Sequence, residues 1–492
     1  MKKNRTWIVL LLIVSMTFCL LAACGQADPH EAGTETGEEK PTETQTESET
    51  QLPPPIEPRL FNTDLNVLHY TVTGSEESYT PWEEIAVEDA SGDILTDDIY
   101  DRNNWLSERY GIDVTVEYCG HEKLKEKADT AIGSGTQDFQ VLDTFGFLSG
   151  RLMGQSYFLN MRQIDTIGLS NPWWNQDILD TYSIAGFVEF AASDMLFLDR
   201  GATSIMIFNQ EMAEELGIED PYSQVRQGKW TMEALAKNLE LGYRDNGDGI
   251  MDGNDTWGLV AGDDLNLALF EAAGEKIVRM DEDGYFYYAF LEPDVQEVMM
   301  NVYDDIMLNQ YFFNAYLERE NTVPSFDNGQ ALFTYGTAKV TKSLRSIELV
   351  YGLIPVPKYA EEQKEYISWV NAWHDSMFAV MANVSDPEAV GAALELMSYY
   401  SYLNIRSDFY DTVICGRGTR NAESIEMLNI LFENRVYDMG ITNDTANTFA
   451  DAVMRNTATG SSSFASLISS HENDIQSHLD DMNALVEEYS FK

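Results

Sequence analysis

The feature that most constrains the fold is an alternation of strand-like and helix-like segments near the start of the folded part. The strand-like segments are residues 65–72, 112–118 and 139–142, and the helix-like stretches are residues 96–110, which Thr96 is expected to cap, and 122–132. Gly111 follows the first of these stretches, where a glycine commonly ends a helix. Strand–helix–strand alternation favours parallel strands joined by right-handed crossovers. The sequence therefore predicts an α/β fold.

The length of the chain predicts more than one core. Residues 59–492 have ordinary apolar and aromatic content, and this stretch exceeds the ~100–200 residues of one typical domain. Two lobes are therefore expected.

The N-terminal segment predicts export and lipid attachment. Lys2, Lys3 and Arg5 precede an apolar run, and Ala22 and Ala23 follow it. This pattern is typical of a signal peptide, and the run is shorter than the ~20 residues that span a bilayer. The tetrapeptide 21–24 resembles a lipobox, so we expect a lipoprotein signal peptide over 1–23 and diacylglycerol on Cys24, with palmitate completing the anchor. The mature chain would then sit at the outer face of the cell membrane.

A disordered tether is expected to follow. Residues 24–58 are rich in Thr, Glu and Pro with almost no apolar side chain, and they end near Pro53-Pro54-Pro55. Such a segment cannot bury enough surface to offset the entropy of ordering it.

Charge and missing motifs exclude several functions. The formal net charge is -51, which opposes binding to nucleic acid or to an anionic membrane surface. The sequence has no Gly-x-Ser-x-Gly elbow, His-Glu-x-x-His motif, Walker loop or dinucleotide fingerprint. We therefore expect a protein that is not an enzyme and needs no cofactor. A glycoside hydrolase stays open as an alternative, because that reaction needs only two carboxylates.

The cysteines leave one pairing open. After Cys19 and Cys24 are assigned to the signal and the anchor, Cys119 and Cys415 remain. They could form a disulfide in an oxidising exterior, although their separation in sequence gives no geometric support.

Seven short segments, taken in order, resemble the extracellular solute-binding proteins (family 1) of ABC importers, the sugar-binding group that includes maltose-binding protein. They are residues 104–114, 132–141, 205–212, 228–235, 326–333, 351–359 and 379–389. For example, Ile207-Phe208-Asn209-Gln210-Glu211 is similar to the family's Tyr-Asn-Lys-Asp step, and Thr231 stands at its Thr-Trp helix start.

The resemblance implies a two-lobed periplasmic-binding-protein-like fold (type II), with crossover hinge strands and the ligand in a cleft between the lobes. On that template the N-terminal lobe takes 59–172 plus 325–368, and the C-terminal lobe takes 173–324 plus 369–492. It also implies a monomer that binds a carbohydrate and delivers it to ABC permease subunits, with hinge closure around the ligand. A surface glycan-binding adhesin or sensor with the same fold is the alternative.

Candidate ligand-binding residues combine aromatic rings with carboxylates and an arginine near segment ends, a combination that suits sugars. They are Asp143, Phe145, Trp173, Trp174, Asp199, Arg200, Tyr335, Trp369, Trp373 and Asp375. Core packing is the alternative role for each aromatic residue.

Residues 244–255 resemble a twelve-residue Ca²⁺ loop. The residues that match its oxygen-ligand positions are Asn246, Asp248, Ile250 through its carbonyl, Asp252 and Asp255. Arg244 occupies the first position, where a cation would oppose the metal. A structural Ca²⁺ site and a metal-free turn both stay open. Finally, apolar residues at helical spacing predict a terminal helix over 466–489, packed against the C-terminal lobe.

Overall fold

The structure is a computed structural model that describes residues 52–71, 84–317, 322–344, 347–411, 422–442, 452 and 464–491. The chain divides into two units, Met1–Pro53 and Pro54–Lys492, and every described helix and strand lies in the second. The predicted signal peptide, Cys24 and most of the tether lie outside the described residues. None of the described helices is long and apolar enough to cross a membrane.

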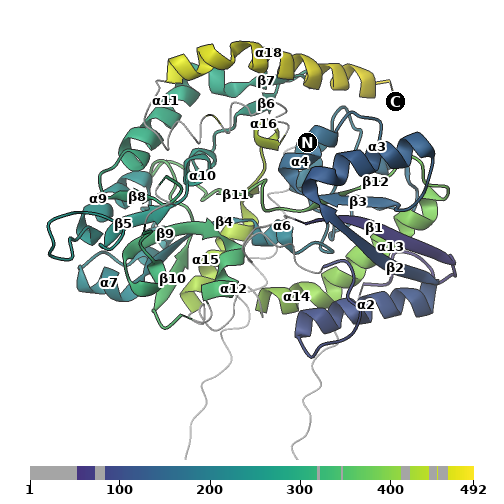
Figure 1. The fold of residues 1–492 in the computed structure, drawn as a ribbon, viewed down its shortest axis with the longest axis horizontal. Helices are drawn as coiled ribbons and strands as arrows, with labels where there is room; N and C mark the ends of the chain where they lie inside the picture. The colour runs from purple at the N-terminus through teal and green to yellow at the C-terminus, as the bar shows by residue number, and fades with distance from the viewer. Residues whose placement is uncertain are drawn as a thin grey trace, which may run out of the picture. The chain divides into compact units, whose positions relative to one another are not determined.

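The first sheet confirms the predicted parallel strands. Its strands are β1 (Thr63–Thr71), β2 (Ile112–Gly120), β3 (Val141–Thr144) and β12 (Met377–Val380), in the order β12-β3-β1-β2. β1 pairs in parallel with both β2 and β3, whereas β12 runs antiparallel to β3. The alternating pattern of the sequence is thus a set of crossover connections (Figure 1).

Helices connect and flank these strands. They are α2 (Ile94–Tyr110), α3 (Leu124–Ser134), α4 (Gly146–Leu152) and α13 (Pro387–Tyr400). α2 ends at Gly111, which has φ 62° as expected of a helix-ending glycine. The expectation that Thr96 caps this helix is wrong: Asp93 is the cap, and its side chain accepts a hydrogen bond from the Thr96 backbone N–H.

The second sheet has five strands. They are β4 (Ser204–Asn209), β5 (Trp257–Ala261), β8 (Phe312–Asn314), β9 (Ala331–Thr337) and β10 (Tyr351–Ile354), in the order β10-β4-β9-β5-β8. α9 (Met232–Gly242) packs on β5, and α15 (Ala422–Glu433) packs on β10. Thr231, at the predicted helix start, caps α9 because its hydroxyl accepts a hydrogen bond from the Ala234 N–H.

Strand pairing corrects the predicted lobe boundaries. The range 325–368 was assigned to the lobe of 59–172, but β9 and β10 within it pair with β4 and β5. Conversely, β12, within 369–492, pairs with β3 of the first sheet. The order of short segments along a chain does not determine which sheet each strand joins, because pairing depends on distant partners.

The remaining elements fill the connections. They are α5 (Gln176–Tyr182), α6 (Leu198–Gly201), α7 (Gln210–Glu215), α8 (Pro221–Arg226), α10 (Leu265–Ala272), β6 (Val278–Met280), β7 (Phe286–Tyr288), α11 (Pro293–Val302), α12 (Thr341–Leu344), β11 (Ser368–Trp369), the π-helical turn η8 (Ser401–Ile405), α14 (Arg406–Phe409), β13 (Arg435–Val436) and α16 (Met439–Thr442). β6 pairs with β7, and β11 pairs with β13.

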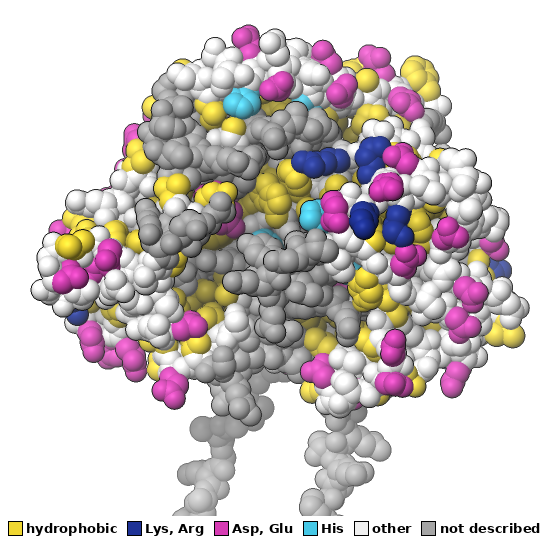
Figure 2. All heavy atoms as spheres, in the orientation of Figure 1, with side chains coloured by type: hydrophobic (Ala, Val, Ile, Leu, Met, Phe, Trp, Pro, Cys, Tyr) yellow, Lys and Arg dark blue, Asp and Glu magenta, His cyan; other side chains and the backbone are white. Residues whose placement is uncertain are grey.

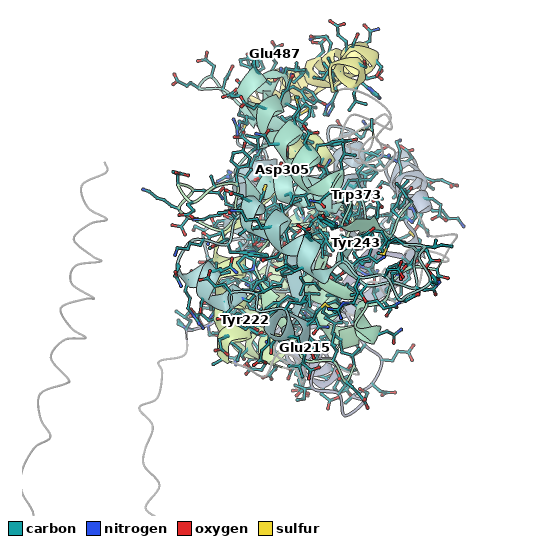
Figure 3. The ribbon with its side chains drawn as sticks, turned by 90° about the vertical axis from the view of Figure 1, so that its left-hand side faces the viewer. Glu215, Tyr222, Tyr243, Asp305, Trp373 and Glu487 are labelled. Carbon is teal, nitrogen blue, oxygen red and sulfur yellow. The ribbon has the colours of Figure 1, made fainter. Side chains whose placement is uncertain are left out.

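The predicted terminal helix is present as α18 (Phe464–Tyr489). Along its length the Asn483 amide bonds both the N–H and the carbonyl of Phe286 in β7. At its end the Tyr489 ring stacks on Phe187 with centroids 4.2 Å apart. Phe187 lies close in sequence to Ala191, which bridges β12. The helix therefore contacts β7 along its length and, at its end, the segment that precedes the bridge to β12; Figure 3 labels Glu487 on this helix.

Candidate functional site

The segment 370–376, which leads from β11 to β12, contacts elements of both sheets. Val370 forms a β-bridge with Thr203, just before β4, and the Asn371 N–H donates to the Ala202 carbonyl at 3.0 Å. On the other side the Phe147 N–H of α4 donates to the Ala372 carbonyl at 2.9 Å. Side chains of this segment therefore lie where the two sheets are joined.

Aromatic rings gather on this segment. Trp373 stacks on Phe147 with centroids 5.2 Å apart and an interplanar angle of 26°. It also meets the edge of Trp369 at 6.2 Å. Trp369 is fully buried, whereas Trp373 is half-buried. Trp373 and its stacking partner Phe147 are both half-buried, so this pair has surface left for a ligand's apolar face.

Polar groups lie beside the rings. The buried Asn371 donates from Nδ2 to Asp264 Oδ2 at 3.0 Å and accepts at Oδ1 from the Trp373 N–H. Asp264 precedes α10 and follows β5. Burial, together with repulsion from Asp263, raises the pKa of Asp264 to about 7, although the hydrogen bond from Asn371 opposes the rise.

Tyr335 on β9 adds a hydroxyl to this neighbourhood. Its Oη lies 3.0 Å from Ser204 Oγ. Burial, reinforced by the charge of Asp264, raises the tyrosine pKa well above its ordinary value, so the hydroxyl keeps its proton. Asn371 is buried and bonded to both Asp264 and the Trp373 N–H, so it positions the half-buried Asp264 as the carboxyl beside Trp373 that could accept from a ligand hydroxyl.

Asp375 holds segment 370–376 against α4. Its Oδ1 accepts from the Gly146 N–H at 2.6 Å, and the Tyr70 hydroxyl donates to its backbone carbonyl at 3.2 Å. Burial raises the pKa of Asp375 well above its usual range, and nearby carboxylates, including that of Asp199, add to the rise. Because this carboxyl is fully buried, its role is to position the segment.

Asp143 has a similar supporting role at the end of β3. It bonds His69 on β1, and its Oδ1 accepts from the Ser376 hydroxyl at 3.0 Å. Burial lowers the pKa of His69, but the charge and hydrogen bond of Asp143 outweigh it, so the net shift is upward. Phe145 packs its ring 5.0 Å from Tyr70.

Four of the predicted site residues lie elsewhere. Trp173 meets the edge of Tyr399, and the Trp174 indole donates to Glu395, so both rings pack against α13. Their environment matches the core-packing alternative. Asp199 accepts from Asn175, Arg435 and Tyr437, and Arg200 pairs with Asp194.

Three residues of the site were missed by the sequence analysis: Phe147, Asn371 and Asp264. Asp264 lies just beyond the end of β5 and Asp143 lies near the end of β3, so the same search for polar residues at strand ends would have found Asp264. Asn371 and Phe147 carry no such signal, because their importance comes from long-range contacts.

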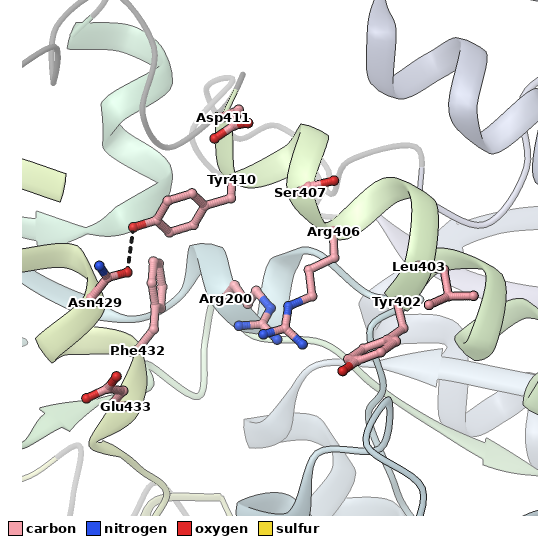
Figure 4. A pocket seen from close by; sticks show the side chains of 10 residues that line it. All are labelled: Arg200, Tyr402, Leu403, Arg406, Ser407, Tyr410, Asp411, Asn429, Phe432 and Glu433. Atoms are coloured by element: carbon pink, nitrogen blue, oxygen red, sulfur yellow. Dashed lines mark hydrogen bonds between the residues drawn. The ribbon is translucent and has the colours of Figure 1, made fainter. Parts of the chain in front are cut away.

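A cavity of about 580 Å³ lies apart from this cluster. Its walls are formed by Arg200 and by residues of η8, α14 and α15, and Figure 4 shows two guanidinium groups side by side among aromatic rings.

On the face drawn in Figure 2, Lys and Arg side chains are few and most lie in one group near the centre, while Asp and Glu are scattered widely. This face therefore reflects the strong acidity of the sequence.

The candidate Ca²⁺ loop is organised by its own side chains. Asp255 accepts from the Asn246 and Asp252 N–H groups, and Asp248 Oδ1 accepts from the Ile250 N–H. Among the described residues, no group of three or more His, Cys, Asp or Glu side chains is placed to hold a metal ion. Cys119 is buried, and Cys415, the other cysteine of the pairing left open by the sequence, lies outside the described residues.

Solved structures of sugar-binding proteins share this fold. The cyclic alpha-maltosyl-1,6-maltose binding protein of Arthrobacter globiformis matches with a TM-score of 0.57 at 12% identity, covering 85% of this chain and 99% of that one. The GacH receptor of Streptomyces glaucescens, solved also with acarbose, gives a TM-score of 0.55 at 13% identity over 85% and 99%. An ABC substrate-binding protein from Listeria monocytogenes, in complex with cycloalternan, gives 0.52 at 11% over 86% and 99%.

Comparison by sequence adds nothing to this result: no protein-family model matches the chain, and no curated protein matches it. At such low identity the structural likeness establishes the fold, a two-lobed α/β architecture of the periplasmic-binding-protein type.

Proposed function

We propose that this chain is a non-enzymatic carbohydrate-binding protein of an ABC importer that holds its ligand against Trp373. The observation that carries the proposal is the half-buried Trp373, stacked on Phe147 and flanked by Asn371 and Asp264, where segment 370–376 joins the two sheets. A saccharide ring presents an apolar face for stacking and hydroxyls for hydrogen bonds, and this cluster offers both. The shared fold of solved sugar-binding proteins supports the same ligand class.

The site suits binding followed by closure. Segment 370–376 contacts α4 on one side and the start of β4 on the other. A ligand seated on it would contact groups attached to both sheets, so the ligand would favour whichever arrangement brings those groups together. Delivery to a permease would then depend on recognition of that closed arrangement.

Membrane attachment belongs to the same proposal. It rests on the signal-like residues 1–23 and on Cys24. Radioactive palmitate supplied to producing cells should label the chain, and Cys24→Ser should abolish the label. Labelling that persists in the Cys24→Ser variant would overturn the anchor site.

Calorimetric titration of residues 25–492 with a panel of mono- and oligosaccharides tests the proposed ligand class. We expect one saccharide to bind and to be recovered intact, and we expect Trp373→Ala to weaken its binding by about tenfold or more, because a stacking face is lost. Tyr285→Ala is the matched control, since Tyr285 is an exposed aromatic residue of the β6–β7 turn. Turnover of the saccharide would instead support a glycoside hydrolase, and equal binding by both variants would remove Trp373 from the site.

A further inference from the structure

The cavity of about 580 Å³ is a second candidate binding site. Its volume lies within the ~300–1,000 Å³ that small-molecule pockets occupy. Arg200 of α6, Arg406 of α14 and Phe432 of α15 all line it. None of these residues belongs to the cluster around Trp373.

Two arginines of the cavity share a single buried carboxylate. Arg200 donates to Asp194 Oδ1 at 2.7 Å, and Arg406 lies 3.5 Å from Asp194 Oδ2. The Asp194 side chain is only 6% exposed, whereas those of Arg200 and Arg406 are 21% and 44% exposed. One buried carboxylate therefore balances two cations, and both cations keep exposed surface.

The two acidic residues that also line the cavity do not neutralise this pair. Asp411 and Glu433 lie apart from the two guanidinium groups in Figure 4. Among the described residues, neither forms an ion pair with Arg200 or Arg406. In a chain with a net charge of -51, two arginines that share one buried carboxylate mark a site that favours an anion.

The remaining walls suit a ring-sized body. Arg406 lies over the Tyr402 ring with its Cζ 5.2 Å from the centroid. On the opposite wall Tyr410 and Phe432 meet edge to face at 6.1 Å, and the Tyr410 hydroxyl donates to Asn429 Oδ1 at 2.9 Å. Aromatic faces around a pair of guanidinium groups would bind a flat or cyclic molecule that bears a carboxylate, since the planar fork of arginine matches that group.

We propose that this cavity binds a small cyclic carboxylate, with Arg200 and Arg406 on the carboxylate and the rings of Tyr402 and Phe432 on its body. The ligand could be a sugar acid or an aromatic acid, which share this chemistry. The site is independent of the proposed carbohydrate site, because the two have no residue in common.

Calorimetric titration of residues 25–492 with galacturonate, benzoate and the neutral sugar galactose tests the proposal. We expect galacturonate or benzoate to bind, added salt to weaken the binding, and galactose to fail to compete with the bound acid. Whichever acid binds identifies the source of the carboxylate. Binding of neither acid would overturn the proposal.

Variants locate the binding. Arg406→Gln should weaken binding of the acid about tenfold or more, because it removes a charge-assisted hydrogen bond. Arg226→Gln is the matched control, since Arg226 is 40% exposed and pairs with Glu426 outside the cavity. Arg406→Lys, which keeps the charge but not the fork, should give an intermediate loss and guards against misfolding of the glutamine variant.

Trp373→Ala separates this site from the carbohydrate site. It should leave binding of the acid unchanged even if it abolishes binding of a neutral saccharide. Loss of acid binding in Trp373→Ala, or unchanged acid binding in Arg406→Gln, would place the acid elsewhere and overturn the proposal without affecting the carbohydrate site.

Discussion

Replacing Tyr489 by phenylalanine should detach the last turns of α18 from the segment around Glu189. The Tyr489 hydroxyl donates to Glu189 Oε1 at 2.8 Å, and the two side chains are 5% and 2% exposed. Phenylalanine keeps the ring that stacks on Phe187 and removes only the donor. The Gly154 N–H still donates to Glu189 at 3.0 Å, so the carboxylate keeps a partner in the variant.

The size of the effect follows from the charge of the acceptor. A buried hydrogen bond to a charged group contributes about 1.5–3 kcal/mol to the free energy of unfolding. The loss should concentrate in the C-terminal turns of α18, because Asn483 and His478 hold the rest of the helix to β7. Native-state hydrogen exchange of the amides near residues 485–489 should therefore accelerate by about ten- to a hundredfold.

The same hydrogen bond has a defined pH dependence. Burial, together with the charge and the hydrogen bond of Glu189, raises the pKa of Tyr489 above its ordinary value. A group with a raised folded-state pKa contributes stability that is fully present below its unfolded pKa, about 10, and is lost as pH rises toward the folded value. The difference between wild type and Tyr489→Phe should therefore be constant around neutral pH.

The matched control is Tyr285→Phe, since Tyr285 is 38% exposed. It should change neither exchange nor stability by more than about 0.5 kcal/mol. If Tyr489→Phe behaves like this control, the Tyr489–Glu189 bond does not hold the helix end, and the reasoning is refuted.

Three further predictions concern buried or bonded carboxylates. Glu395→Gln should lower the free energy of unfolding by about 1–3 kcal/mol, because Gly168, Asn171 and Trp174 all donate hydrogen bonds to this carboxylate. Urea titration measures this change, and an unchanged unfolding midpoint would show that these hydrogen bonds do not stabilise the fold. Asp264 has a pKa of about 7, raised above its unfolded value of about 4, so its contribution is fully present below the unfolded pKa and is lost as pH rises through the folded pKa. Asp264→Asn should therefore gain stability relative to wild type between about pH 4 and about pH 7 and the difference should level off above that range; parallel stability profiles would reject the shift. The loop of residues 244–255 is held by its own hydrogen bonds, so a Ca²⁺ chelator should leave the melting temperature of the protein unchanged. If the chelator instead lowers the melting temperature of the wild type but not that of Asp248→Asn, the loop is a structural Ca²⁺ site.

The first sheet could be predicted because its signals are local. Apolar alternation marked β1 and β2, and Gly111 marked the end of α2. The terminal helix was likewise visible as an apolar stripe with a period of 3.6 residues. The contact between this helix and Phe187 could not be predicted, because an apolar stripe shows which face of a helix is buried but not what that face packs against.

The second sheet was only partly predictable. The range 325–368 is predicted to join the lobe of 59–172, but β9 and β10, which lie within it, pair with β4 of the second sheet. Their pairing with β4 joins residues that are more than a hundred positions apart, and nothing in a local pattern encodes it.

The site shows the same division. Trp369, Trp373 and Asp375 were selected because aromatic and acidic residues meet in one short segment, and the structure places that segment between the sheets. Trp173 and Trp174 gave an equally strong local signal but pack on α13, because Glu395, 221 residues from Trp174, accepts the Trp174 indole N–H. Composition cannot distinguish these two cases.

The central claim is that a carbohydrate binds against Trp373 between elements of the two sheets. A crystal structure of the chain with the saccharide identified by titration tests it most directly. The account predicts a sugar ring against Trp373, with hydrogen bonds from the neighbourhood of Asn371 and Asp264. A saccharide bound elsewhere, or touching elements of one sheet only, would contradict it.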